Sequence, residues 1–168
     1  IVRLESVHDT LTGLFNRRHM EAVLKREAKR AKRHNISVGI VMIDIDHFNV
    51  FNDTYGHEMG DKVLSEIGKF ILENIRDEDI ACRYGGEEII IILPGASLQN
   101  TERRAEQLRQ GIESLAVKMY DEEHTVTASL GVALFPEHGT TIKGVIRAAD
   151  SALYRAKEKG RNKVLVAA

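Results

Sequence analysis

The sequence is poor in several features that would place it in a specialised class of protein. Its only cysteine, Cys82, excludes a disulfide framework and is typical of a reducing cytoplasm. No apolar run approaches the roughly 20 residues of a membrane-spanning helix, and no signal peptide is visible. Charge of neither sign dominates, because 24 Lys and Arg stand against 25 Asp and Glu. We therefore expect a cytoplasmic domain, free-standing or part of a membrane-anchored sensor, with no nucleic-acid partner and no membrane contact of its own.

The composition that remains supports one globular domain with a sizeable core. The chain has 168 residues, of which 43% are hydrophobic and 29% charged. We expect this domain to span residues 9–168. Residues 1–8 begin without a Met and carry apolar residues at helical spacing. We expect them to be the end of an N-terminal helical stalk or linker cut from a longer protein.

Hydrophobic periodicity predicts alternating strands and helices. The expected strands lie near residues 37–44, 79–83, 87–93, 124–134 and 163–166, and the expected helices near 17–34, 60–75, 100–116 and 141–158. Asn16 is the expected N-cap of the first helix. The outward residues of that helix are strongly basic, which fits an exposed face better than a phosphate-binding stripe. The order βααββαβ predicts an α/β (α+β) sandwich, in which helices pack on a central, mostly antiparallel sheet.

The stretch from Arg83 to Ile89 combines a turn with two acids. Gly85 and Gly86 stand between two strand-like runs, which predicts a tight hairpin turn, because glycine reaches positive φ without a Cβ penalty. Such a turn also lets a ligand approach the backbone closely. Glu87 and Glu88 then enter a very apolar strand, where a carboxylate needs a partner such as a divalent cation. The alternative is a hairpin with solvated acids at its tip.

A second acidic stretch follows another strand. Residues 37–43 form a continuous, β-branched apolar run, which predicts a central strand buried on both faces. The run ends in Asp44-Ile45-Asp46. If this strand and the one that begins at Glu87 are neighbours, their carboxylates can share hard cations. That is the ligand chemistry of Mg²⁺ bound to nucleotide phosphates.

Four further segments lie in a fixed order around the Gly85-Gly86-Glu87-Glu88-Ile89 motif. They are Asp9 to Arg18 (DTLTGLFNRR), Asp44 to Phe48 (DIDHF) with Asn52-Asp53, Gly56-His57 with Gly60-Asp61, and Ala152-Leu153-Tyr154 with Ala156-Lys157 and Gly160-Arg161-Asn162. Together these five motifs resemble the GGDEF domain, the catalytic domain of diguanylate cyclases, in a GGEE variant. The resemblance covers residues 9 to 166. Similar folds occur in nucleotide cyclases and polymerase palms, so the fold alone does not fix the function.

The resemblance implies a diguanylate cyclase that condenses two GTP into cyclic di-GMP and releases two pyrophosphates. Each domain would hold one GTP, so catalysis would need a homodimer in which the 3′-hydroxyl of one nucleotide attacks the α-phosphate of the other. An upstream regulatory domain would bring the two protomers together. One alternative is a catalytically weak or degenerate domain that binds GTP or cyclic di-GMP. Another is a different nucleotidyl cyclase of similar fold.

The resemblance also implies a metal site. Asp44, Glu87 and the carbonyl of Ile45 match the ligands of two Mg²⁺ (or Mn²⁺) ions per active site, and Glu87 would also accept the proton of the attacking 3′-hydroxyl. Side chains alternate along a strand, so Glu87 and Glu88 cannot both point into the site unless the turn is distorted. Glu88 ranks second and Asp46 third among the candidate acids. Local hydrogen bonding is an equal alternative for these two.

Substrate contacts are implied in the same way. Asn52 and Asp61 match the residues that hold guanine, and a site with these two polar partners would reject ATP. For Asp61 the alternative is that it caps a helix that starts there. Lys157 and Arg161 match phosphate contacts, although cations at a helix end can also merely offset its dipole. Further expected substrate-binding residues are His57, Gly85 and Gly86.

Arg76 and Asp79 match the Arg-x-x-Asp pattern of the family's product-binding, inhibitory site. A surface ion pair is the alternative. Gln107 occupies the place of a second Arg of that site, with Arg103, Arg104 and Arg109 nearby. Two other positions depart from the family: Ile89 stands where Phe is usual, and Asn49 where Lys is usual. The first is a change within the core, and the second removes a cation near the reacting phosphate.

Overall fold

The computed structural model describes residues 6–168 of the chain. In chain order its elements are α1 (Arg17–His34), β1 (Val38–Ile45), α2 (Phe48–Tyr55), α3 (His57–Glu73), β2 (Ile80–Arg83), β3 (Glu88–Pro94), α4 (Leu98–Glu113), β4 (Val117–Met119), β5 (Glu122–His124), β6 (Ala128–Phe135), α5 (Ile142–Glu158) and β7 (Val164–Val166). Asn16 caps α1 as expected, since its side chain accepts a hydrogen bond from His19. Among the described residues, no helix combines the length and the apolar character needed to cross a membrane.

The expected stalk falls mostly outside the described residues, which exclude 1–5. Residues 6–8 are not helical and lie against the start of the domain. The carbonyl of Val7 accepts a hydrogen bond from the backbone nitrogen of Asn16 at 2.8 Å, and His8 forms a β-bridge with Phe15. These contacts join residues 6–8 to the segment that leads into α1.

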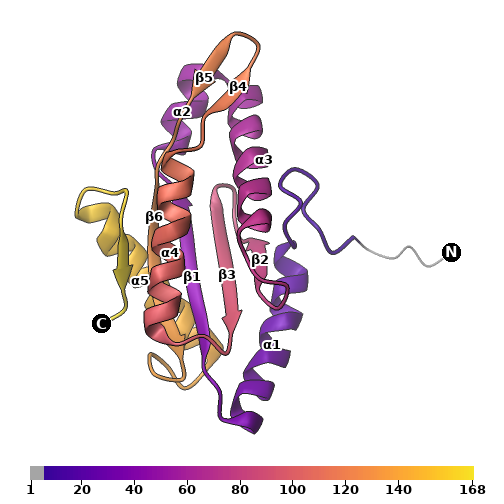
Figure 1. Ribbon diagram of the computed structural model, residues 1–168, viewed down its shortest axis with the longest axis vertical. Helices are drawn as coiled ribbons and strands as arrows, with labels where there is room; N and C mark the ends of the chain where they lie inside the picture. The colour runs from indigo at the N-terminus through magenta and orange to yellow at the C-terminus, as the bar shows by residue number, and fades with distance from the viewer. Residues whose placement is uncertain (1–5) are drawn as a thin grey trace, which may run out of the picture.

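Five strands form one sheet in the order β2-β3-β1-β6-β7 (Figure 1). β1 is the central strand and pairs antiparallel with both β3 and β6, while β7 pairs parallel with β6. All eight residues of β1 are buried. The predicted sandwich with a mostly antiparallel sheet is therefore confirmed, as is the prediction of a central strand buried on both faces.

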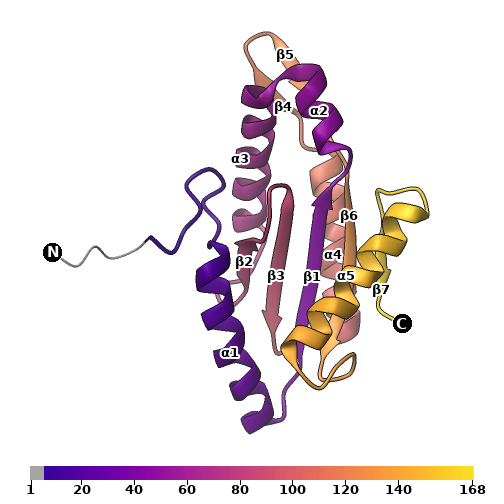
Figure 2. The ribbon, with the colours of Figure 1, turned by 180° about the vertical axis from the view of Figure 1, so that it is seen from behind.

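The two faces of the sheet have separate cores. Val41 and Ile43 of β1 pack in the core beneath α3 and α4, which lie in front of the sheet in Figure 1. Ile40 and Met42 alternate to the other face and pack in the core beneath α1 and α5, which lie in front in Figure 2. The basic residues of α1 are exposed on the outside of this layer, as expected of a solvated helix face.

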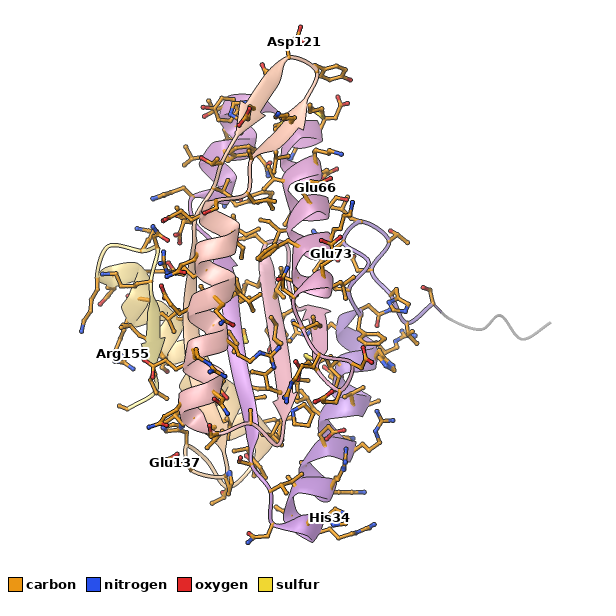
Figure 3. The ribbon with its side chains drawn as sticks, viewed as in Figure 1. His34, Glu66, Glu73, Asp121, Glu137 and Arg155 are labelled. Carbon is orange, nitrogen blue, oxygen red and sulfur yellow. The ribbon has the colours of Figure 1, made fainter. Side chains whose placement is uncertain are left out.

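Two predicted elements differ from the observed ones. The helix expected from residue 60 begins at His57, and the short helix α2 precedes it; α2 buries Phe48 and Phe51 at helical spacing but is too short to give a periodic signal. The strand expected at 124–134 is two strands, because polar β5 pairs with β4 in a separate hairpin and only β6 joins the sheet. This hairpin, with Asp121 at its tip, projects from the opposite end of the molecule to His34 (Figure 3).

Close packing of α5 on β6 depends on one glycine. A Cβ at Gly131 would lie 2.0 Å from the carbonyl oxygen of Ala149 and 2.4 Å from the backbone nitrogen of Leu153. Because these are backbone atoms of α5, the helix would have to move to make room. Gly131 therefore sets the distance between α5 and the sheet, and with it the position of the C-terminal turn of α5.

We predict that Gly131→Ala lowers the free energy of unfolding by about 3 kcal/mol, because overpacking against backbone atoms forces a helix to shift. Urea denaturation monitored by circular dichroism measures the change. Gly86→Ala is the matched control: a Cβ there meets no atom within 4 Å. That control should stay within about 0.5 kcal/mol of the parent. Equal midpoints for the parent and Gly131→Ala would show that α5 does not pack as closely as described.

Candidate active site

The two acidic stretches meet where β1 ends and β3 begins. Asp44 and Glu88 are directly opposite each other in the register of these strands. One step further along, the backbone nitrogen of Ile45 donates a hydrogen bond to the carbonyl of Glu87 at 3.3 Å. The strands that carry the acids are therefore neighbours, which is the condition on which the predicted cation site depends.

Two cavities flank Asp44. One, of about 150 Å³, is lined by Asp44, Ile45 and Glu87 together with Asn49, Lys157 and Arg161. The other, of about 220 Å³, is lined by Asp44 and Lys157 together with Glu88, Asp150, Leu153 and Tyr154. The neighbouring glutamates thus line different cavities, in agreement with the alternation expected of a strand. Glu87 lines the same cavity as Ile45 and the cationic Arg161, whereas Glu88 does not.

Asp44 carries a negative charge that its surroundings offset only in part. Burial raises the pKa of Asp44; the charge and hydrogen bond of Lys157 Nζ act in the opposite direction, and the charges of Glu87 and Asp46 raise the pKa further. The pKa of Glu88 is also raised, first by burial and then by the charges of Asp44 and Asp150. A cation bound beside Asp44 would relieve this excess of negative charge.

The oxygen donors around the cavity suit Mg²⁺, but they are too few to hold the ion without further ligands from outside the protein. Asp44 and Glu87 offer carboxylate oxygens and Ile45 a carbonyl oxygen, which are the hard ligands that Mg²⁺ prefers. Within residues 6–168, no three or more His, Cys, Asp or Glu side chains are grouped so that they could hold a metal ion. An ion here would therefore complete its shell with water and substrate phosphates, as Mg²⁺ does in nucleotide-binding enzymes.

Asp46, the third candidate acid, has its carboxylate engaged within the domain. Its oxygens accept hydrogen bonds from the hydroxyl of Thr127 at 2.7 Å, the hydroxyl of Ser129 at 2.6 Å and the backbone nitrogen of Asn162 at 3.0 Å. The side chain is buried. Asp46 therefore makes the local hydrogen bonds that we considered as the alternative to a role as a catalytic acid.

Gly85 and Gly86 form the predicted turn, but not by the predicted conformation. The backbone nitrogens of Tyr84 and Gly85 both donate to the carbonyl of Glu88, at 2.8 and 3.2 Å, which closes the hairpin. Neither glycine has a positive φ, so that part of the prediction is wrong. Four residues separate β2 from β3, and a connection of this length does not need the left-handed residues of a two-residue turn.

Arg83 holds this turn, a role that the sequence motifs did not indicate. Its guanidinium donates to the carbonyl of Gly86 at 2.8 Å and to that of Gly85 at 3.3 Å. Asp9 in turn binds the other side of the guanidinium, with both oxygens 3.3 Å from Arg83 Nη1. The only signal in the sequence was the position of an Arg beside the Tyr-Gly-Gly turn, with an Asp in the first family motif.

The expected guanine contacts lie on α2 and α3. Asn52 packs on Gly60, where a Cβ would come within 1.7 Å of Asn52 Oδ1. That oxygen is buried and, among the described residues, has no hydrogen-bond partner. Asp61 and His57 are exposed on α3. The alternative role of Asp61 as a helix cap is wrong, because α3 begins four residues earlier, after Gly56.

The cations at the end of α5 do more than offset a helix dipole. Lys157 forms an ion pair with Asp44, and Arg161 lines the cavity that contains Glu87. Asp150 lies two turns before Lys157 on the same helix and lines the other cavity. Its spacing of seven residues from Lys157 was the signal that could have identified it.

Arg76 and Asp79 lie together outside both cavities. Asp79 has a fully buried side chain, which accepts hydrogen bonds from the backbone nitrogen of Arg76 at 2.8 Å and from its guanidinium at 3.3 Å. Arg104 of α4 is the third member, with Nη2 2.7 Å from Asp79. Of the basic residues near Gln107, Arg104 therefore contacts the Arg-x-x-Asp pair. Arg109 instead contacts Glu106, Glu113 and Asn162.

Comparison with known proteins agrees with this arrangement. Residues 6–163 match the family described as "Diguanylate cyclase, GGDEF domain". The diguanylate cyclase DosC of Escherichia coli K12 is 39% identical over 165 residues, which cover 98% of this chain and 36% of DosC. The response regulator PleD of Caulobacter vibrioides NA1000 is 40% identical over 162 residues, which cover 95% of this chain and 36% of PleD. This chain thus spans little more than a third of the length of these relatives.

Solved structures show the same fold. The GGDEF domain of DgcB from Caulobacter crescentus, crystallised in complex with c-di-GMP, superimposes with a TM-score of 0.92 at 33% identity. The match covers 99% of this chain and 98% of that one. The chain belongs to the GGDEF domain family.

We predict a pH-dependent role for Asp9 in stability. Burial would raise the pKa of Asp9, but hydrogen bonds from Thr12 and the charge of Arg83 outweigh burial and lower it. A carboxylate with a lowered folded pKa adds stability above its unfolded pKa of about 3.9 and loses it as the pH falls through the folded value. Asp9→Asn should therefore lower the free energy of unfolding at pH 7 by about 1 kcal/mol.

Urea denaturation of the parent and Asp9→Asn from pH 7 down to pH 3 measures this effect. The two midpoints should converge as the pH falls. Asp121→Asn, at the exposed tip of the β4–β5 hairpin, is the control and should match the parent at every pH. A difference between parent and Asp9→Asn that stays constant down to pH 3 would contradict the role assigned to the ionised carboxylate.

Proposed function

We propose that this domain is a diguanylate cyclase that converts two GTP into cyclic di-GMP and two pyrophosphates. The observation that carries the proposal is the meeting of Asp44, Glu87 and the Ile45 carbonyl with Lys157 and Arg161 around one cavity. Oxygen ligands and cations that line the same cavity suit a metal-bound triphosphate. Membership of the GGDEF family supports GTP as the nucleotide.

Asp44, Ile45 and Glu87 would hold the two Mg²⁺ or Mn²⁺ ions expected in each active site. When bound, these ions would neutralise negative charge on the triphosphate, on the attacking 3′-oxygen and on the leaving pyrophosphate. Lys157 and Arg161 then bind phosphate oxygens from the side of α5. Glu87 accepts the proton of the attacking 3′-hydroxyl. Gly85 and Gly86 carry no side chains that would keep the nucleotide away from the turn.

Asn52 and Asp61 would select guanine. The Oδ1 of Asn52 packs on Gly60, and the amide nitrogen of the same side chain can donate to guanine O6 or N3. The exposed carboxylate of Asp61 accepts from guanine N1–H and N2–H, and His57 lies at the same end of α3. Adenine would leave these groups unpaired, so ATP should be rejected strongly.

Catalysis would need a homodimer, since each domain binds one nucleotide and the two must react with each other. An upstream regulatory domain in the full-length protein would bring the protomers together. We propose that cyclic di-GMP binds and inhibits at Arg76 and Asp79. Because Arg76 and Arg104 cover the carboxylate of Asp79, one of them must turn aside before Asp79 contacts a guanine.

One observation favours a second function, binding without efficient turnover. Asn49 lines the cavity with Glu87 and Arg161, at the position where the family usually has Lys. A domain that lacks this cation could serve as a GTP or cyclic di-GMP binding module. Asp44 and Glu87 are both present, however, and a pure binding module would not need them. We therefore expect a slow enzyme.

We predict that Glu87→Gln abolishes cyclic di-GMP formation while the domain stays folded. The variant loses both a metal ligand and the proton acceptor, so the rate should fall at least about 10²-fold. Purified protein is incubated with GTP and Mg²⁺, and the product is identified by chromatography. Glu73→Gln, on the exposed surface of α3 (Figure 3), is the matched control and should keep the parent rate.

The same assay examines the dimer. Specific activity should rise with protein concentration, because two half-sites must meet.

Near-parent turnover by Glu87→Gln would remove this residue from the mechanism. No product from the parent at any concentration, with GTP still bound, would favour the binding module.

We predict that Asn49→Lys raises kcat with little change in KM. A Lys would place a full positive charge where negative charge grows in the transition state, and loss of one such preorganised group commonly costs about 10²-fold in rate, or about 3 kcal/mol. Lys157 and Arg161 cover part of that loss, so the gain should be smaller. Because the effect is confined to the transition state, KM should hardly move.

Steady-state kinetics at equal dimer fraction compare the parent with Asn49→Lys. Asn49→Gln is the control, because it lengthens the side chain without adding charge, and it should give no gain. An unchanged or lower kcat for Asn49→Lys would rule out this account of Asn49.

A further inference from the structure

The turn after α5 has an unfavourable backbone conformation. Arg161 has φ of 63° and Asn162 φ of 47°, so two consecutive residues other than glycine are left-handed. This conformation costs roughly 1–2 kcal/mol for an ordinary residue, and Asn tolerates it better than Arg. Something must hold the turn in place, and Arg161 is the residue that lines the cavity beside Glu87.

Asp46 provides the first anchor. Its Oδ2 accepts a hydrogen bond from the backbone nitrogen of Asn162 at 3.0 Å. The carboxylate itself cannot swing away, because hydroxyl groups of Thr127 and Ser129 also donate to it, at 2.7 and 2.6 Å. Asp46 follows the last residue of β1, whereas Ser129 lies in the neighbouring strand β6. The turn is thereby tied to the centre of the sheet.

The side chain of Asn162 provides a second anchor, on α4. Asn162 Oδ1 accepts a hydrogen bond from Arg109 Nη1 at 2.7 Å, and Asn162 Nδ2 donates to Glu113. Arg109 is fixed in turn by Glu106, with Nη2 2.6 Å from its carboxylate. Backbone and side chain of Asn162 are therefore held from two different elements.

We propose that Asp46 is a positioning residue that holds the Arg161–Asn162 turn so that Arg161 faces the triphosphate. Asn162 and Arg109 support the same turn from α4. This inference rests on the proposed function, because Arg161 contacts phosphate only if a nucleotide binds in this cavity. Three donors already contact the two oxygens of Asp46, so this carboxylate is engaged in holding the turn.

Two substitutions at one position separate positioning from metal binding. Asp46→Asn keeps an oxygen that can accept from Thr127 and from the backbone of Asn162, and its amide nitrogen can donate to the hydroxyl of Ser129. Asp46→Ala removes every one of these bonds. A metal ligand would need the charge, so both substitutions would be equally harmful. A positioning residue needs the hydrogen bonds, so Asn should rescue what Ala loses.

The measurement is the affinity for an α,β-methylene analogue of GTP with Mg²⁺, by isothermal titration calorimetry. Loss of a group that orients a ligand typically costs 10- to 100-fold, so Asp46→Ala should bind the analogue at least about tenfold more weakly than the parent. Asp46→Asn should stay within about threefold. When either substitution of Asp46 is combined with Arg161→Ala, the affinity for the analogue should fall little further, because the residue that Asp46 positions is already gone.

A second variant guards against misfolding of Asp46→Ala. Asn162→Gly keeps the left-handed turn accessible but removes the contacts to Arg109 and Glu113. It should weaken binding in the parent but not in Arg161→Ala. Losses that add independently to that of Arg161→Ala, or equal losses for Asp46→Asn and Asp46→Ala, would overturn the inference. A parent that binds no analogue at all would instead overturn the proposed function.

Discussion

The rest of the site depends on one buried charge, the carboxylate of Asp44. It lies where the central strand ends, and burial beside Glu87 and Asp46 raises its pKa although Lys157 pairs with it. A carboxylate in such a place is costly unless a cation completes its surroundings. Lys157 reaches it because α5 packs directly on Gly131 of β6. The electrostatics of the site therefore depend on how closely α5 packs on the sheet.

The central position of β1 explains why so many groups meet at its end. On one side the start of β3 brings Glu88, with Glu87 just before it, and on the other β6 brings Ser129 to Asp46. Helix α4 packs on the sheet and carries two arginines that reach different sites: Arg104 contacts Asp79, and Arg109 contacts Asn162. One helix therefore touches both the Arg-x-x-Asp pair and the turn that carries Arg161.

Much of this arrangement could be predicted from local sequence. Continuous apolar runs predict β1 and β3, and the acids at their ends predict where charge gathers. What local sequence could not give were features decided by contacts between distant segments. The polar strand β5 lies outside the main sheet because it pairs with β4. Neither Gly85 nor Gly86 has a positive φ, and Arg83, a residue outside the turn's glycines, donates to the carbonyls of both. In the same way, Asp46 faces donors that lie more than 80 residues away.

The central claim is that a divalent cation and the triphosphate meet at Asp44, the Ile45 carbonyl and Glu87. Crystals of the domain grown with Mn²⁺ and an α,β-methylene analogue of GTP test it directly, because Mn²⁺ gives an anomalous signal. The account predicts anomalous density in contact with those three groups, and phosphate oxygens beside Lys157 and Arg161. Density between Glu88 and Asp150 instead, or a nucleotide seated away from β1, would contradict it.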